Sequence, residues 1–122
     1  MLHRDTLIGQ WHRSEKNEFD SFSEFAELFA DGRFSFTFYT YNLDGTLLEQ
    51  ITELGDWGLV GDIHFTITKC EVENGIEYPA DMLNEDNYQA YKVLTLSEQE
   101  FTYQHVVSGE TFSLSRVATS TN

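Results

Sequence analysis

The chain has 122 residues, of which 40% are hydrophobic, so it can build one domain with a packed core and is too apolar for a disordered chain. Seven Lys and Arg oppose 21 Asp and Glu, and the formal net charge of −14 disfavours nucleic acid and anionic membranes, which bind clustered cations. No apolar run approaches the roughly 20 residues of a membrane-spanning helix. We therefore expect a single domain over residues 1–122, with no nucleic-acid or membrane partner.

The start of the chain has no apolar signal segment, and Cys70 is the one cysteine. A secreted domain held by disulfides would carry an even set of cysteines, so the sequence predicts a cytoplasmic protein. The acidic residues are concentrated between Glu71 and Asp86, where six carboxylates occur without a Lys or Arg. That segment is either a solubilising surface or a docking site for a basic protein.

Alternation of apolar and polar residues, which is typical of half-buried strands, marks nine candidate strands separated by tight turns. They lie at about 7–15, 24–29, 33–41, 46–54, 56–60, 63–71, 88–96, 101–107 and 110–117. Segments 46–54 and 56–60 form either two strands or one strand bent at Gly55, which would leave eight. A short helix is also predicted at 79–86, with Pro79 in its first turn.

The segment from Phe19 to Phe29 fits two structures. Phe19, Phe22, Phe25 and Phe29 are three, three and four residues apart, as on one face of a helix. Residues 24–29, however, also alternate directly into an Asp-Gly turn. We predict a strand at 24–29 and a loop or short helix at 17–23, and leave open whether the segment begins as helix or strand.

Strand parity assigns each side chain to a face. Phe34, Phe36 and Phe38 share one face of 33–41, and Phe101, Tyr103 and His105 share one face of 101–107. In the segment 63–71 the apolar residues Ile63, Phe65 and Ile67 lie together, and parity therefore places His64 on the outer face. His12 is also expected outside, because it alternates with Trp11.

Many short strands joined by tight turns predict an all-β fold. We expect an antiparallel up-and-down meander of about eight strands, closed into a barrel because closure removes the exposed sheet edges, with at most one or two short helices. Leu7, Gly9 and Trp11 share one face of the first strand, so Trp11 is a candidate plug for the closed end. Arg116 faces inward on the last strand, where the Trp11 ring could receive its guanidinium.

Four segments, in this order, resemble the small bacterial lipocalin-like domains of the calycin superfamily. They are LIGQWHR (7–13), LFADGRFSF (28–36), LGDWGLVGDIHFTI (54–67) and ETFSLSR (110–116). The resemblance implies a lipocalin-like barrel in which Gly9 and Trp11 form the family's Gly-x-Trp and Arg116 its C-terminal arginine. It also implies that Trp57 opens a strand and anchors it against the core, so that both tryptophans are architectural. Residues 72–88 form a longer acidic connection than is usual in such domains.

No group of residues has the spacing of a known reaction centre. His3, His12, His64 and His105 form no metal-ligand pattern, and no nucleophile elbow or phosphate-binding loop occurs. We therefore predict no catalytic residue, no metal and no cofactor. His105 shares its face with aromatic residues, which indicates a barrel-lining side chain.

The aromatic inner faces and the family resemblance together predict a non-enzymatic barrel that binds a small apolar or aromatic molecule in its interior. Phe36, Phe38, Tyr91 and Tyr103 are the expected wall residues, and Arg13 and His105 the polar anchors.

Two alternatives remain open at the level of sequence. One is a solid-core interaction module that forms a homodimer or binds a basic protein, using the acidic segment and the exposed tyrosines Tyr39 and Tyr41. The other is a small barrel enzyme, with Glu27 turned inward beside Arg13, Tyr103 and His105.

Overall fold

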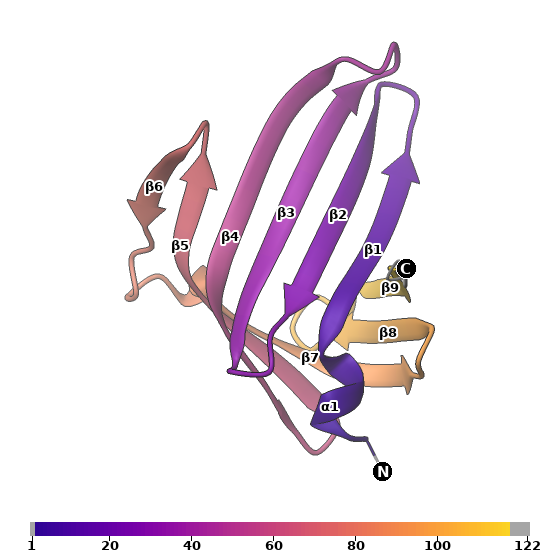
Figure 1. Ribbon diagram of the computed structural model, residues 1–122, viewed down its shortest axis with the longest axis vertical. Helices are drawn as coiled ribbons and strands as arrows, with labels where there is room; N and C mark the ends of the chain where they lie inside the picture. Colours follow the sequence, from indigo (N-terminus) through magenta and orange to yellow (C-terminus); the bar gives the residue numbers. More distant parts are fainter. Residues whose placement is uncertain (1, 118–122) are drawn as a thin grey trace, which may run out of the picture.

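Figure 1 shows the computed structural model of the protein, which describes residues 2–117. The strands are β1 (Gly9–Lys16), β2 (Asp20–Leu28), β3 (Arg33–Asn42), β4 (Leu47–Val60), β5 (Ile63–Glu73), β6 (Ile76–Pro79), β7 (Tyr88–Leu96), β8 (Glu100–His105) and β9 (Thr111–Arg116). The helical elements in this part of the chain are α1 (Arg4–Leu7) and a 3-10 turn, η1 (Glu85–Asn87). The all-β prediction, with one or two short helices, is confirmed. None of the helices described is long and apolar enough to cross a bilayer.

Eight of the strands close into an antiparallel barrel. The hydrogen-bonded order is β4-β3-β2-β1-β9-β8-β7-β5, and a β4–β5 pairing completes the circle. β1–β4 stand side by side as a tall curved sheet, and the shorter β7–β9 cross its lower part (Figure 1). The first and last strands meet through two paired positions, Trp11 with Arg116 and His12 with Ser115. The up-and-down barrel is therefore closed between the two ends of the chain.

The candidate strands at 46–54 and 56–60 form one continuous strand, β4, so the prediction of one bent strand is the correct alternative. Its register with β5 shifts between Leu54 and Gly55, where Lys69 of β5 is left without a partner in the ladder. Such a bulge bends the strand, as barrel closure requires. Trp57 therefore lies within a long strand and does not open one, contrary to the expectation.

The predicted strand at 7–15 begins only at Gly9, because Leu7 is the last residue of the helix α1. Contacts distant in sequence hold it, because Arg116 donates hydrogen bonds to the Thr6 carbonyl at 2.5 Å and the Ile8 carbonyl at 2.6 Å. Those carbonyls are thus bonded to a side chain of β9 and not to a strand ladder.

The predicted loop or short helix at 17–23 is only a tight turn, because β2 already begins at Asp20. The Asn17 side-chain oxygen accepts hydrogen bonds from the amides of Phe19 and Asp20, which reverses the chain. Phe22 stacks on Phe38, whereas Phe25 lies on the His12 ring of the opposite, outer face. The helical spacing of these phenylalanines was misleading because they serve both faces of a strand.

β6 was not predicted and lies outside the barrel. It pairs with the end of β5 through a turn at Asn74 and Gly75, whose φ angles are 54° and 76°. Asn-Gly with two positive φ angles is the strongest short hairpin signal, so the sequence did carry the information. The predicted helix at 79–86 is wrong, since Pro79 ends β6 and the 3-10 turn begins only at Glu85.

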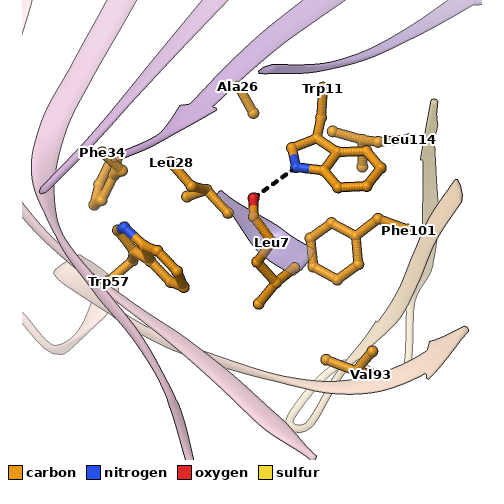
Figure 2. Close-up of a cluster of buried hydrophobic side chains, with 9 residues drawn as sticks. All are labelled: Leu7, Trp11, Ala26, Leu28, Phe34, Trp57, Val93, Phe101 and Leu114. Carbon is orange, nitrogen blue, oxygen red and sulfur yellow. Dashed lines mark hydrogen bonds between the residues drawn. The ribbon is translucent and has the colours of Figure 1, made fainter. Parts of the chain in front are cut away.

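The lower half of the barrel is filled with apolar side chains (Figure 2). The buried cluster consists of Leu7, Trp11, Ala26, Leu28, Phe34, Trp57, Val93, Phe101 and Leu114. Trp11 is fully buried, and its indole N–H donates to the Leu7 carbonyl at 2.9 Å. The helix α1 thus closes this end, with its last residue packed into the core.

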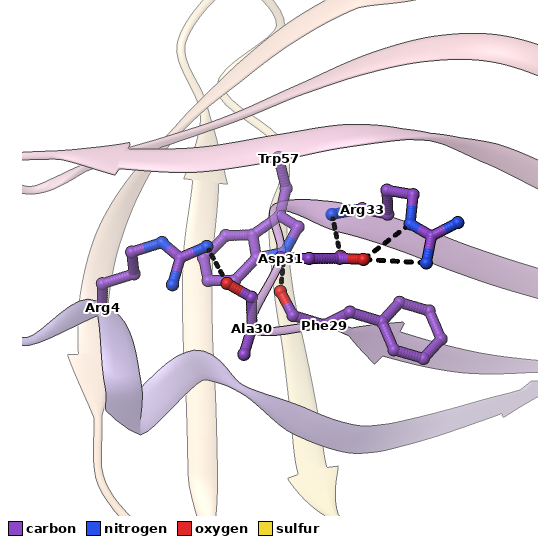
Figure 3. Close-up of polar contacts among 6 residues, drawn as sticks. All are labelled: Arg4, Phe29, Ala30, Asp31, Arg33 and Trp57. Atoms are coloured by element: carbon purple, nitrogen blue, oxygen red, sulfur yellow. Dashed lines mark hydrogen bonds and ion pairs between the residues drawn. The ribbon is translucent and has the colours of Figure 1, made fainter.

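An arginine covers each tryptophan at the closed end. The guanidinium carbon of Arg116 lies 4.0 Å from the centre of the Trp11 ring, and that of Arg4 lies 4.5 Å from the centre of the Trp57 ring. Arg4 also donates to the Ala30 carbonyl, and the Trp57 indole N–H donates to the Phe29 carbonyl (Figure 3). The Arg4 contact was not foreseen, because it depends on the position of α1.

Candidate functional site

A cavity of about 380 Å³ occupies the upper half of the barrel. Along the inner face of the barrel strands, the side chains near one end belong to the apolar core and those near the other end line the cavity. In β1, for example, the buried Trp11 is followed two residues later by Arg13, which lines the cavity, and in β8 Phe101 is followed by Tyr103. The barrel is therefore solid at its closed end and hollow above it.

One wall of the cavity is aromatic. The rings of Tyr91 and Tyr103 meet edge to face with centroids 4.8 Å apart, and the Phe112 ring lies 5.5 Å from Tyr103. Phe36 and Phe38 line the cavity from β3. Burial raises the pKa of the Tyr91 hydroxyl to about 12 and that of Tyr103 well above its ordinary value, so both are neutral hydrogen-bonding groups at physiological pH.

Arg13 reaches the cavity as part of an ion pair. Its Nε donates to a carboxylate oxygen of Glu24 at 2.7 Å, and its guanidinium lies between the rings of Phe22 and Phe112 at 4.9 and 5.1 Å. The Glu24 side chain is only 7% exposed. Burial raises the pKa of Glu24, against the opposing effect of the Arg13 hydrogen bond and charge. Arg13 therefore serves to keep a buried carboxylate in place.

Glu53 is a second interior carboxylate, and it has no cation beside it among residues 2–117. A Thr68 hydroxyl lies 3.5 Å from one of its oxygens. Burial, and then the negative charges of Glu71 and Glu24, raise the pKa of Glu53. Glu71 is near because the bulge at Lys69 brings it directly opposite Glu53 in the ladder, and paired residues share a face.

His64 lies inside the barrel, contrary to the prediction that it faces solvent. Thr66 is paired with Trp57, whose ring fills the core, and this register turns His64, Thr66 and Thr68 inward. Phe65 turns outward and covers Gly58, where an added Cβ would lie 2.4 Å from its ring. The alternation was recognised correctly, but the more apolar face of β5 is the outer one.

The buried His64 imidazole has an unsatisfied nitrogen. The residue is 3% exposed, and its Nδ1 has no hydrogen-bond partner within residues 2–117. Burial lowers the pKa of His64 to about 4, so the ring is neutral at physiological pH. A buried polar atom is normally bonded, so an unpartnered nitrogen on a residue that lines the cavity is unusual.

His105 also lines the cavity, but both of its ring nitrogens are engaged. Its Nδ1 accepts hydrogen bonds from the amides of Val107 and Ser108, which places the proton on Nε2. Nε2 then donates to the side-chain oxygen of Gln89, whose amide nitrogen donates to the Asp86 carbonyl. His105 therefore fixes the loop between β8 and β9 at the rim of the cavity.

The structure brings all six predicted binding residues to one cavity: Arg13, Phe36, Phe38, Tyr91, Tyr103 and His105. Sequence reasoning missed Glu24, Glu53 and His64. Glu27 does not join them, since the buried Glu24 and Ala26 fix the inner face of β2 and Glu27 alternates with them on the outside. Within residues 2–117 no group of His, Cys, Asp and Glu is arranged to hold a metal ion.

No protein-family model and no curated protein matches this chain. Among solved structures, the chain is similar to a lipocalin-like protein from Bacteroides uniformis ATCC 8492, with 21% identity and a TM-score of 0.53. The likeness covers 92% of this chain and 99% of that one. This protein therefore has a lipocalin-like barrel fold, as the resemblance of its sequence segments implied.

Proposed function

We propose that this protein is a non-enzymatic binding protein that holds one small molecule with an aromatic or apolar body in the upper half of its barrel. The observation that carries the proposal is the cavity of about 380 Å³ above a filled core. Ligand sites of small molecules have volumes of about 300–1,000 Å³ and combine apolar walls with a few polar groups. The ring faces of Tyr91, Tyr103 and Phe112 supply the walls.

The state of the polar groups supports binding over catalysis. A general acid or base works best with a pKa near the operating pH and a free nitrogen or oxygen. Both nitrogens of His105 are bonded at the rim, and His64 has a pKa of about 4. Arg13 is bonded to Glu24. His105 and Arg13 therefore hold the wall of the cavity in one shape and are not poised to transfer a proton.

A neutral aromatic probe, 1-naphthylmethanol, tests the proposal by calorimetry and thermal unfolding. At a probe concentration of about 100 times Kd, binding to the folded state alone adds about 2.7 kcal/mol and raises Tm by several degrees. The variant Thr66→Phe, which directs a ring from β5 into the cavity, should abolish both signals.

The matched control is Thr95→Phe, which adds the same ring at an exposed position of β7 and should leave binding unchanged. Equal loss in both variants, or probe binding that survives Thr66→Phe in a folded protein, would place the binding site elsewhere. The absence of any heat or Tm shift for the natural sequence, with this probe and with its charged naphthalene analogues, would overturn the proposal.

A further inference from the structure

Carboxylates outnumber cations around the cavity. Glu24, Glu53, Asp86 and Glu110 line it, and Arg13 is the one cationic side chain that does so in the part of the chain that the structure describes. The chain as a whole carries a formal net charge of −14. A pocket with charges of one sign between low-dielectric walls concentrates ions of the opposite sign. The electrostatic field in this cavity therefore favours cations and disfavours anions.

The one positive charge is already neutralised. Arg13 is bonded to Glu24 at 2.7 Å and to Glu15 at 3.0 Å, so it does not balance a further carboxylate. Glu53 has a hydroxyl 3.5 Å away and two carboxylates, Glu71 and Glu24, as its charged neighbours. A half-buried carboxylate with like charges around it gains more from a ligand cation than an exposed one, because less water screens the interaction.

Two further observations point to a ligand at this place. Tyr91, Tyr103 and Phe112 line the same space, and aromatic rings attract cations that are withdrawn from water. Independently of the acidic residues, His64 lines the cavity, and its buried Nδ1 has no hydrogen-bond partner among residues 2–117. A ligand with a second polar group would satisfy it.

We propose that the ligand of this barrel is an organic ammonium ion with an aromatic or apolar body, whose protonated nitrogen binds to Glu53 while its body packs against the tyrosines. This inference rests on the proposed binding function and adds the charge of the ligand. Glu53 supplies the counter-ion, and Arg13 keeps Glu24 from competing for the same cation.

Three ligands that share one ring system test the charge directly: 1-naphthylmethylammonium, 1-naphthylmethanol and 1-naphthoate. Their affinities are measured by calorimetry at pH 7.5 and low salt. The ammonium ion should bind about tenfold or more tightly than the alcohol, as a charge-assisted hydrogen bond allows, and the carboxylate should bind most weakly.

The variant Glu53→Gln keeps the shape of the side chain and removes its charge, so the ammonium and the alcohol should then bind with similar affinity. Glu27→Gln makes the same change of charge on the outer face of β2 and should preserve the tenfold ratio. A ratio that survives Glu53→Gln, or falls equally in both variants, would show that Glu53 is not the anchor.

The ligand series also separates the two proposals. If none of the three naphthalenes binds, interior binding itself is wrong. If the alcohol binds as tightly as the ammonium ion, the barrel binds ligands but does not select a cation, and only this inference is overturned. The comparison within the natural sequence decides this second point even if Glu53→Gln does not fold.

Discussion

At the residue scale, His64 shows how far a single side chain can depart from its sequence-based assignment. It is flanked by Ile63 and Phe65, which are apolar and were expected to face the core. Its ring instead packs among the rings of Trp57, Tyr91 and Phe101, with centroids 5.6–6.1 Å away. An imidazole enclosed in this way cannot be solvated when it is charged, and that is the cause of its lowered pKa.

Stability should therefore depend on the protonation of His64. Its pKa is about 4 in the folded protein against 6.5 ordinarily, so the unfolded chain takes up the proton first as the pH falls. The part of the free energy of unfolding that depends on a neutral His64 is fully present above pH 6.5 and is lost progressively toward pH 4. In total it amounts to about 3 kcal/mol. Between pH 7.5 and 5 the natural sequence should lose about 2 kcal/mol more than His64→Gln, as measured by urea unfolding.

The test compares how the unfolding free energies of the natural sequence and of His64→Gln change with pH. This comparison is needed because the protonation of Glu24 and Glu53 changes stability in the opposite direction. Their raised pKa values mean that the folded state binds protons before the unfolded chain does, so their protonation stabilises the barrel as the pH falls. His3→Gln, which removes an exposed histidine, is the control. Parallel pH profiles for the natural sequence and His64→Gln would contradict a buried neutral imidazole.

At the element scale, β4 is the strand on which the shape of the barrel depends. It pairs with β3 along its first part and with β5 along its second, and it changes register at Gly55. An added Cβ at Gly55 would lie 1.9 Å from the Ile67 carbonyl oxygen, an atom of the neighbouring backbone. Glycine is thus required there because the two strands approach closely, which is a common role of glycine within a strand.

Gly55→Ala should consequently cost more than Gly58→Ala, although both glycines lie in the same strand. The Cβ at Gly58 would meet the ring of Phe65, 2.4 Å away on the outer face, and that side chain can move. We expect a loss of about 3 kcal/mol or more for Gly55→Ala and about 1 kcal/mol for Gly58→Ala, since overpacking is costly where the backbone must shift. Chemical denaturation measures both, and equal losses would mean that the backbone at Ile67 yields easily.

At the scale of the whole molecule, one side chain reinforces the junction at which the barrel closes. β1 and β9 share only two paired positions, but Arg116 bonds to the carbonyls of Thr6 and Ile8 and also to that of Glu98 at 3.0 Å. Its guanidinium meanwhile covers the Trp11 ring. Gly9 makes this possible, because a Cβ there would lie 2.5 Å from a guanidinium nitrogen of Arg116.

A double-mutant cycle tests whether Trp11 and Arg116 act as a unit. Trp11→Ala removes a fully buried ring and should cost about 3–5 kcal/mol. Arg116→Ala removes the cation–π contact and three bonds to carbonyls, at about 2–3 kcal/mol. The combined loss should fall short of the sum by about 1 kcal/mol or more, because the residues share a contact.

Arg33→Ala is the control for the loss of an arginine. Its side chain is 74% exposed and, within residues 2–117, forms an ion pair with Asp31 alone, so its removal should cost less than about 1 kcal/mol. Additive losses for Trp11 and Arg116, within about 0.3 kcal/mol, would show that the stacking contributes nothing and that closure depends on the carbonyl bonds alone.

The sequence by itself determined the all-β class, the order of the barrel strands and the inner face of most of them. The class and the faces follow from a local signal, the period-two alternation in β3, β8 and β9, which any half-buried strand must carry. The order follows from the tight turns that join consecutive strands. The same alternation placed Phe36, Phe38, Tyr91 and Tyr103 around one space, because neighbouring strands in a meander align their inner faces.

Only the tertiary structure decided what lies inside β5 and what charge the cavity carries. Alternation distinguishes two faces but does not say which one is inside, and a one-residue shift in pairing exchanges them. The pairing of Thr66 with Trp57 turned His64 inward, and the bulge opposite Gly55 brought Glu71 beside Glu53. Such registers depend on how the whole barrel closes, so no short segment of sequence contains them.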